Sequence, residues 1–293
     1  MHRVSRIQSV CRPISKVTRG VPSRSFEACA ECQDVSGPLG TFPAMGDLRE
    51  VFESVARCPN VLACYNTLGP NPCREIVEYQ KQKWAADTYA RFQVPEPWVG
   101  QIDKARILFV ASNPSIGDDD HALGGSDDNT IWESHHLAFG GGSRAYIIDG
   151  IKTTNDKGEP GHTVRYWCSI RARAKELMPT AVPGQDYAIT ELVHCKSRKE
   201  IGVSEAADEC FRKHFENVMA VAKARVIVAL GTFARKRFLG AESPPLTPIE
   251  RQYGGRLRSI IFLPHPSSFV GPKSIKGRYP ESLVALQDLI KQA

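Results

Sequence analysis

The chain has 293 residues with a formal net charge of +6, and 42% of the residues are apolar. This apolar fraction is ordinary for a globular protein, so one large domain or two small ones can form around a sizeable core. The charge permits a polyanionic partner without requiring one. No apolar run approaches the roughly 18 to 20 residues of a membrane helix, which argues against a membrane protein.

The N-terminal segment differs in composition from the rest of the chain. Residues 1–26 carry six arginines and lysines and no acidic residue, which is typical of an organelle transit peptide. The alternative is untranslated sequence upstream of a start codon at Met45. In both cases we expect residues 1–44 to be disordered and residues 45–293 to form a single domain. A genuine transit peptide would make the protein mitochondrial; if the protein is bacterial, we expect it in the cytoplasm or nucleoid.

Four apolar runs predict the strands of a central sheet. Each run is continuous rather than alternating, as expected for parallel strands that are covered on both faces. The runs are residues 105–112, 186–194, 224–230 and 257–264.

Helical patterns precede, separate and follow these runs. They cover residues 47–56, 163–178, 204–223, 232–239 and 280–293. We expect Ser204 to cap the third of these helices and Pro280 to lie in the first turn of the last one. The alternation of strands and helices predicts an α/β fold with three α-β-α layers and a central parallel sheet of about four strands.

Ligands of such sheets bind beyond the carboxyl ends of the strands. In this sequence those ends carry Asn113, residues 191–194, Gly231 and His265. The long polar, glycine-rich connection at 115–162 is a further candidate, because a connection of this length is usually functional or disordered.

Three short motifs are more informative together than separately. The turn Asn113-Pro114 follows the first strand, and His265 lies between two prolines and before a pair of serines. Between them, a buried strand ends in a tight glycine turn at Gly231. In this order and at these spacings the motifs resemble those of the uracil-DNA glycosylase superfamily. The resemblance covers about residues 105–290.

The sequence combines features of different branches of that superfamily. Asn113 and the stretch at 164–167 resemble the mismatch-specific and single-strand-selective branches. Residues 189–195, which read Ile-Thr-x-x-Val-x-Cys, and the strand at 226–231 resemble the iron–sulfur, thermophile-type branch. The branch therefore stays open.

The resemblance implies a DNA glycosylase of base excision repair that acts on uracil or a related deaminated base. Such enzymes flip the base out of the duplex or act on single strands. Asn113 would position the water, and His265 would donate a hydrogen bond to the base oxygen on which negative charge develops. Ser112, Pro114 and Ser115 would line the base site.

The resemblance also implies contacts with DNA that contains a damaged base. Ser267 and Ser268 are suited to holding a phosphate. Phe269 lies where the family inserts an apolar wedge into the base stack. Phe139 and Trp132 are candidates to stack on the flipped base, and Phe139 is preferred. We expect the protein to act as a monomer.

Glu191 departs from the family pattern. It occupies the place of an asparagine that reads the base edge in the iron–sulfur branch. An ionised carboxylate only accepts hydrogen bonds, so it suits the N3–H of uracil and repels O4 unless burial keeps it protonated. A base edge with an amino group would fit an ionised Glu191 better, which puts uracil itself in question. Alternatively, Glu191 faces away from the base and pairs with a lysine or arginine.

Nine cysteines are many for an intracellular enzyme, and an odd number without a secretory signal argues against a disulfide framework. The spacing of Cys195 and Cys210 resembles the second ligand pair of the iron–sulfur branch. Cys29 and Cys32 have the Cys-x-x-Cys spacing of the first pair, but they lie in the N-terminal segment.

The nearest other candidates for the first pair are Cys58, Cys64 and Cys73. Four thiolates, drawn from these three together with Cys195 and Cys210, would hold a 4Fe–4S cluster. A zinc site and buried free cysteines are the alternatives.

Two other functions stay open. A catalytically weak or inactive nucleic-acid-binding protein can share this fold, since fold alone does not establish activity. The basic insert of a covalently trapping relative is not found between Arg235 and Pro266. An unrelated α/β enzyme that binds a nucleotide is disfavoured, because neither a Gly-x-x-x-x-Gly-Lys loop nor a Gly-x-Gly-x-x-Gly fingerprint is found.

Overall fold

The computed structural model describes most of the chain from residue 47 onward. The described residues are 47–67, 69–117, 122–139, 147–154, 159–269 and 271–292. The expected N-terminal segment, with Cys29 and Cys32, lies outside them. Within these ranges, no helix is both long enough and apolar enough to cross a membrane.

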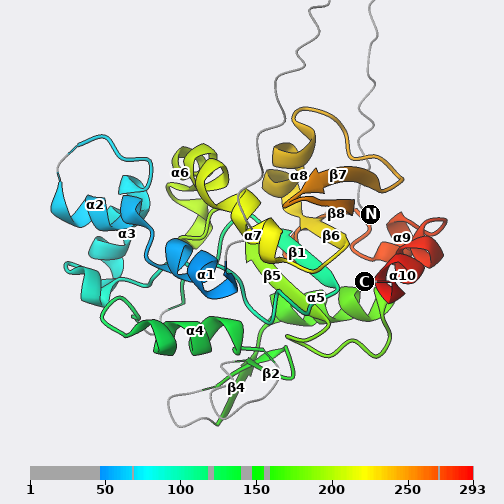
Figure 1. The fold of residues 1–293 in the computed structure, drawn as a ribbon, viewed down its shortest axis with the longest axis horizontal. Coiled ribbons are helices and arrows are strands. Elements are labelled where there is room, and N and C mark those ends of the chain that lie inside the picture. The colour runs from blue at the N-terminus through cyan, green and yellow to red at the C-terminus, as the bar shows by residue number, and fades with distance from the viewer. Residues whose placement is uncertain are drawn as a thin grey trace, which may run out of the picture. The chain divides into compact units, whose positions relative to one another are not determined.

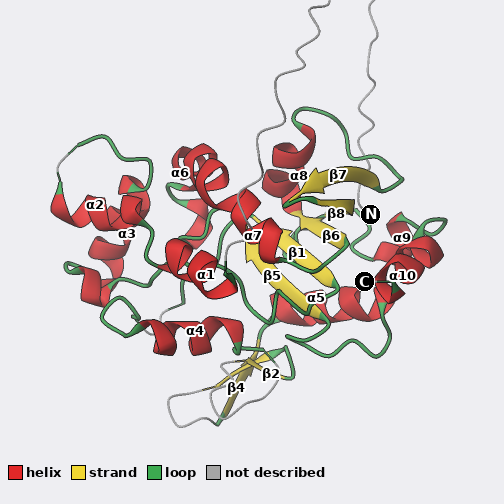
Figure 2. Ribbon diagram, viewed as in Figure 1, coloured by secondary structure: helices red, strands yellow, loops and turns green. Residues whose placement is uncertain are grey.

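A five-stranded sheet forms the centre of the fold (Figures 1 and 2). The strand order is β5-β1-β6-β8-β7, and all neighbours are parallel except β8 and β7. The strands are β1 (Ile107–Ala111), β5 (Tyr187–Glu191), β6 (Val226–Leu230), β7 (Ile249–Tyr253) and β8 (Arg256–Leu263). The four parallel strands confirm the prediction made from the apolar runs.

The edge strand β7 is the one strand of this sheet that the apolar runs do not predict. Its residues are half-buried or exposed, whereas every residue of β1, β5 and β6 is buried. It pairs with β8 through a tight turn at Gly254 and Gly255, whose φ angles are 56° and 74°. Glycine adopts this conformation without steric cost, so β7 owes its place to the hairpin rather than to burial.

Successive side chains of the buried strands enter two cores, one on each face of the sheet. Leu108 and Val110 of β1 belong to the first core, and Ile107 and Phe109 to the second. The first core is covered by α1 (Leu48–Ala56), α4 (Asp128–His136), α7 (Glu216–Val221) and α8 (Gly231–Leu239). The second is covered by α5 (Arg165–Leu177), α9 (Ile275–Arg278) and α10 (Leu283–Lys291). The predicted three-layer α-β-α arrangement is therefore confirmed.

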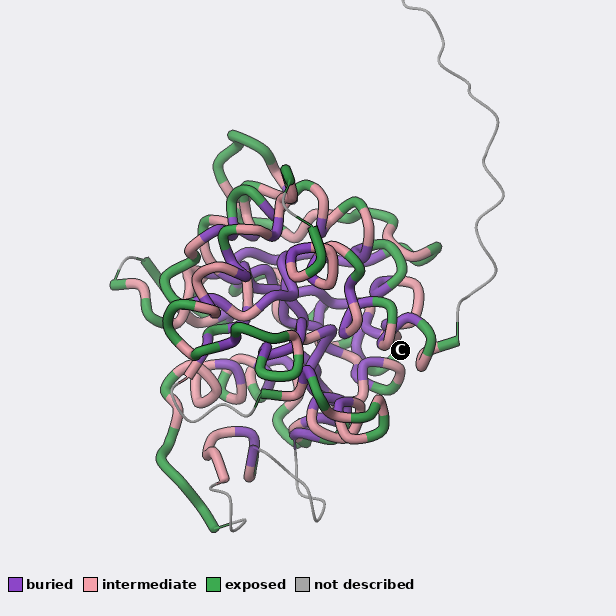
Figure 3. Tube along the Cα trace, turned by 90° about the vertical axis from the view of Figure 1, so that its left-hand side faces the viewer, coloured by how far each residue is buried: buried purple, intermediate pink, exposed green. Residues whose placement is uncertain are grey.

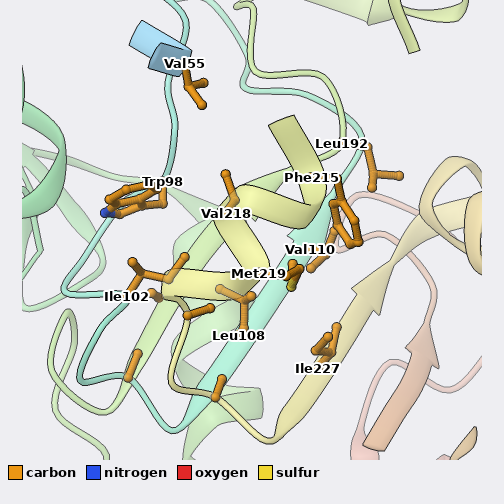
Figure 4. Close-up of a cluster of buried hydrophobic side chains, with 14 of the residues drawn as sticks. Val55, Trp98, Ile102, Leu108, Val110, Leu192, Phe215, Val218, Met219 and Ile227 are labelled. Atoms are coloured by element: carbon orange, nitrogen blue, oxygen red, sulfur yellow. The ribbon is translucent and has the colours of Figure 1, made fainter. Parts of the chain in front are cut away.

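Figure 4 shows the first core, in which Val218 and Met219 of α7 pack over Leu108 of β1 and Ile227 of β6. The buried residues are concentrated at the centre of the fold, inside a rim of exposed ones (Figure 3). The sheet is thus a rigid platform for whatever its carboxyl edge carries.

The segment before the sheet builds a third core that the sequence reading does not predict. Helices α2 (Pro59–Asn66) and α3 (Arg74–Trp84) and the short 3₁₀ helix Tyr89–Arg91 pack against α6 (Val203–Cys210) and the segment after β5. Five buried cysteines belong to this core.

The predicted helix at 204–223 is confirmed as one continuous helix with a π turn. Helix α6 leads through the π-helical segment Phe211–Phe215 into α7. Its N-cap is Gly202, so the expectation that Ser204 caps it is wrong. A Cβ at Gly202 would lie 2.8 Å from the main-chain nitrogen of Ile76, so the contact with α3 requires glycine here.

The long connection at 115–162, which we expected to be functional or disordered, contains α4 and leads into a small sheet of β2 (Ile147–Ile148), β3 (Lys152–Thr154) and β4 (Pro160–Thr163), so disorder does not apply to these parts. One further expectation is wrong. The last helix has Ser282 as its N-cap, so Pro280 lies before the helix rather than in its first turn.

Candidate active site

The carboxyl ends of the four parallel strands bring the predicted site residues to one edge of the sheet. Glu191, the last residue of β5, is paired with the last residue of β1, and Leu230 of β6 is paired with Leu263 of β8. Asn113 and His265 follow two residues after β1 and β8 end. Because β1 lies beside β6, these strand ends form one row along the edge.

Hydrogen bonds hold the Asn113 turn against the segment that follows β5. The main-chain N–H of Val193 donates to the carbonyl of Ser112 (2.9 Å), and that of Ser197 donates to the carbonyl of Pro114 (3.0 Å). The Asn113 Nδ2 donates to the carbonyls of Pro114 (2.8 Å) and Ser197 (3.0 Å). Because both partners accept, the amide orientation is assigned by this network, and the Ser112 Oγ donates to the Asn113 Oδ1 at 3.4 Å. The second lone pair of Oδ1 can accept a hydrogen bond from a water molecule.

His265 stacks on the ring of Tyr166, with the ring centroids 5.5 Å apart and 26° between the planes. Its Nδ1 accepts a hydrogen bond from the main-chain N–H of Ser267 at 3.2 Å, so the proton of the neutral ring lies on Nε2. Burial lowers the pKa of His265, although Glu200 opposes this effect and Lys273 adds to it. The side chain is thus a neutral imidazole at pH 7 and can donate one hydrogen bond from Nε2.

Contacts from several elements fix the main chain that carries His265. Gly231, at the start of α8, has a φ of 85°, and a Cβ there would lie 3.2 Å from the Cβ of His265. The Lys273 Nζ donates to the carbonyl of Pro266 (2.9 Å), and Arg173 of α5 donates to the carbonyl of Lys273 (2.7 Å). The position of the imidazole therefore depends on α5, on α8 and on the loop after β8.

Glu191 and Tyr166 present unsatisfied polar atoms. Glu191 is 4% exposed, and neither its Oε2 nor the Tyr166 hydroxyl has a hydrogen-bond partner. Burial raises the pKa of Glu191 well above its usual value; the Glu96 carboxylate adds to the rise and Lys196 opposes it. Burial, and then the carboxylates of Glu191 and Glu96, also raise the pKa of Tyr166. Buried polar atoms are normally bonded, so this pair is a candidate for ligand recognition.

The alternative reading, in which Glu191 pairs with a lysine or arginine, finds no such ion pair among the described residues. Lys196 is paired with Glu96, with Nζ 3.5 Å from Oε2. Glu96 also lies 3.7 Å from the Nε2 of His135. Lys196 therefore pairs with Glu96, while its charge also opposes the rise in the pKa of Glu191.

The remaining predicted residues of the edge differ in exposure. Ser112 and Pro114 are buried, whereas Ser115 is exposed. In the loop after β8, Ser267 is exposed and Ser268 is half-buried. Phe269 is fully exposed, with a relative accessibility of 103%, so it contributes nothing to the core.

The two aromatic residues expected to stack on the base lie elsewhere. Phe139 is buried against Trp167 and Tyr187, with ring centroids 6.3 and 5.8 Å away. Tyr187 begins β5, at the opposite end from Glu191. Trp132, in α4, packs against the core on the other face of the sheet. These positions do not support a stacking role for either residue.

The aromatic residue that does lie at the edge is Tyr166. It belongs to the stretch at 164–167 whose resemblance to the family is evident from sequence, but helical periodicity does not tell which side chain of α5 reaches His265. The structure places Asn113, Glu191 and His265 at the same edge of the sheet, where Tyr166 stacks on His265.

A separate cluster of thiols lies within the third core. Four cysteines line one small cavity together with two histidines: Cys58, Cys73, Cys195 and Cys210, with His194 and His214. Cys64 is also buried, but it is not among the lining residues. All cysteines that the structure describes are free thiols.

The contacts within this cavity are close. The thiols of Cys73 and Cys195 are hydrogen-bonded to each other. The Nε2 of His214, in the π turn, lies 3.4 Å from the Sγ of Cys58. Across the described ranges, no group of three or more His, Cys, Asp or Glu side chains is arranged to hold a single metal ion.

Comparison with known families agrees with this geometry. The family model described as the Uracil DNA glycosylase superfamily matches residues 97–285, which is more than half of the chain. Asn113, Tyr166, Glu191 and His265 all lie inside the matched segment. A search of curated proteins finds no match to the chain. The chain therefore belongs to the uracil-DNA glycosylase superfamily, whose members are generally DNA glycosylases.

Proposed function

We propose that the protein is a DNA glycosylase of base excision repair that hydrolyses the N-glycosidic bond of uracil or a related deaminated base. The observation that carries this proposal is the row formed by Asn113, Glu191 and His265 at the carboxyl edge of the sheet, inside the segment matched to the superfamily. Ligands of open α/β sheets bind at this edge.

The orientation of two side chains supports the chemistry. Breaking the bond leaves negative charge on the base oxygen, and a donor aimed at that oxygen stabilises the transition state. The neutral His265 supplies such a donor from Nε2. Asn113 has Oδ1 available to orient the attacking water. An amide cannot take up the proton of that water as a carboxylate would, so we expect modest rates.

The surface around the edge is suited to DNA. The exposed Phe269 can enter the base stack as a wedge, and Ser267 and Ser268 offer hydroxyl and N–H groups to a phosphate. Arg198 and Lys199 are exposed directly after the segment that holds Asn113, where their charges favour a polyanion. We propose that the protein acts as a monomer on DNA with a damaged base.

We also propose that Cys58, Cys73, Cys195 and Cys210 hold a 4Fe–4S cluster. Four thiols from distant segments of the chain lining one buried cavity fit such a ligand set. When bound, the group would tie α2 and α3 to the segment after β5, and His214 would donate a hydrogen bond to the Cys58 thiolate.

Base excision by purified protein tests the activity. Labelled single- and double-stranded oligonucleotides would carry uracil, hypoxanthine, xanthine or a mismatched thymine, and abasic sites would be revealed by alkaline cleavage. We expect excision of at least one deaminated base and a loss of about 100-fold or more in Asn113→Ala and His265→Ala. His162→Ala, at an exposed histidine, serves as the matched control. Folded protein that excises none of the bases but binds DNA in a salt-sensitive manner would instead be a nucleic-acid-binding protein.

A further inference from the structure

Glu191 lies in surroundings that favour a neutral carboxylic acid. Its side chain is almost completely buried, and its Oε2 has no donor within hydrogen-bond reach. A buried carboxylate is stable only when donors or cations compensate for the lost water. The structure provides no such compensation at Oε2, so the neutral form is favoured.

The charged groups that face Glu191 come from three segments. Glu96, ahead of β1, adds negative charge, and Lys196, after β5, adds positive charge that it shares with Glu96 at 3.5 Å. Tyr166, from α5, faces it with a hydroxyl that also lacks a partner. Glu96 is approached in turn by His135 at 3.7 Å. This arrangement disfavours a second buried negative charge at Glu191.

The protonation state decides which base edge Glu191 can read. An ionised carboxylate offers only acceptors, whereas a neutral carboxyl offers one donor and one acceptor, as an amide does. Uracil and hypoxanthine present a ring N–H beside a carbonyl oxygen, which requires one acceptor and one donor. Guanine presents its ring N–H between a carbonyl oxygen and an amino group, and the amino side requires two acceptors, as an ionised carboxylate provides. A neutral Glu191 therefore suits the ring N–H and carbonyl oxygen of uracil and hypoxanthine, which an ionised carboxylate would repel at the oxygen.

Tyr166 supplies a second recognition group. Its ring stacks on His265, and its hydroxyl group has no hydrogen-bond partner, so it can donate to an acceptor on a ligand. A base held between Glu191 and His265 would bring carbonyl oxygens to this part of the edge. A base with a ring N–H and carbonyl oxygens can therefore form hydrogen bonds with both the Glu191 carboxyl group and the Tyr166 hydroxyl.

We propose that Glu191 reads the base edge as a neutral carboxylic acid, assisted by the Tyr166 hydroxyl, and that the substrates are bases with a ring N–H beside a carbonyl oxygen. This inference rests on the proposed glycosylase function. It assigns to Glu191 the hydrogen-bonding pattern of an amide, and it removes the conflict between a carboxylate at this position and uracil as the substrate.

The test is the pH dependence of single-turnover excision of uracil from a single-stranded oligonucleotide. For the parent, we expect the rate constant to fall about tenfold per pH unit above the pKa of Glu191, because only the neutral form reads the base. Glu191→Gln carries an amide that is neutral at every pH, so its rate should stay within about threefold over the same range. Tyr166→Phe should lower the rate about tenfold without moving the pH dependence.

An equal alkaline fall in the parent and in Glu191→Gln would overturn the inference, as would a folded Glu191→Gln protein that excises no uracil. Infrared difference spectra of the parent against Glu191→Gln at pH 7 add a measurement that needs no activity. We expect the band of a neutral carboxyl in the parent, and its absence would overturn the inference even if no base is excised. If that band is present but the parent excises no base, the glycosylase function fails while the neutral state of Glu191 stands.

Discussion

Replacing Gly231 by alanine should displace the imidazole of His265. The residue has a φ of 85°, and the added Cβ would lie 3.2 Å from the Cβ of His265. Optimal separation between carbon atoms is about 3.5 to 4.0 Å, so the His265 loop must move by a few tenths of an ångström. A misplacement of about 1 Å costs about 100-fold in rate, and the smaller shift here predicts a loss of about three- to tenfold in base excision.

The backbone strain of this substitution can be separated from the contact. Alanine at positive φ costs about 1–2 kcal/mol, which should lower the Tm by about 2–8 °C for a domain of this size. Gly255 has a φ of 74° and no atom within 4 Å of an added Cβ, so Gly255→Ala should lose similar stability and no activity. Thermal unfolding and single-turnover excision would be measured for both variants. An equal loss of activity in the two would show that the contact with His265 has no effect on catalysis.

Four further predictions concern other parts of the molecule. Cys210→Ser should abolish bound iron and the cluster absorbance in anaerobically purified protein, whereas Cys64→Ser, outside the cavity, should retain both. The cluster would be excluded if both the parent and Cys64→Ser contain no iron. Arg258 is fully buried and donates to four main-chain carbonyls around the end of α7 and the β7–β8 turn. Arg258→Met should lower the free energy of unfolding in urea by about 3 kcal/mol, because the carbonyls lose their donor. An unchanged free energy of unfolding would refute this role. Phe269→Ala should leave stability within about 0.5 kcal/mol of the parent but reduce excision from duplex more than from single-stranded DNA; equal effects on both substrates would argue against a wedge. Burial lowers the pKa of His136 to about 4, below the unfolded value of about 6.5. The neutral His136 therefore contributes to the free energy of unfolding at pH 7, and this contribution is lost as the pH falls through about 4. In urea unfolding, His136→Gln should lose less stability than the parent on acidification, and an identical loss would contradict the lowered pKa of His136.

The central sheet could be predicted because burial on both faces leaves a direct mark on the sequence. Strands β1, β5 and β6 are covered by helices on each side, so each reads as a continuous apolar run. The edge strand β7 has one partner and mostly solvated side chains, so its sequence carries no such run. Helices α2 and α3 escaped prediction because each buries only a few residues in the third core, and five of the thirteen buried members of that core are cysteines.

The candidate site was predictable in part for a similar reason. Asn113, Glu191 and His265 follow strand ends, and parallel strands end at the same edge. Tyr166 comes from a helix, and its contact with His265 depends on how α5 packs against the loop after β8. Phe139 was expected at the site because it lies in a long glycine-rich connection, but tertiary packing against Tyr187 draws it into the core.

Release of the free base tests the central claim most directly. The protein would be incubated with an oligonucleotide that carries a single uracil, and then one with hypoxanthine, and the free base and the abasic strand would be quantified by mass spectrometry. A glycosylase predicts one free base for each abasic site, with the release lost in His265→Ala. Folded protein that releases no base from any substrate, or that breaks the strand with the base still attached to its sugar, would contradict the proposed activity.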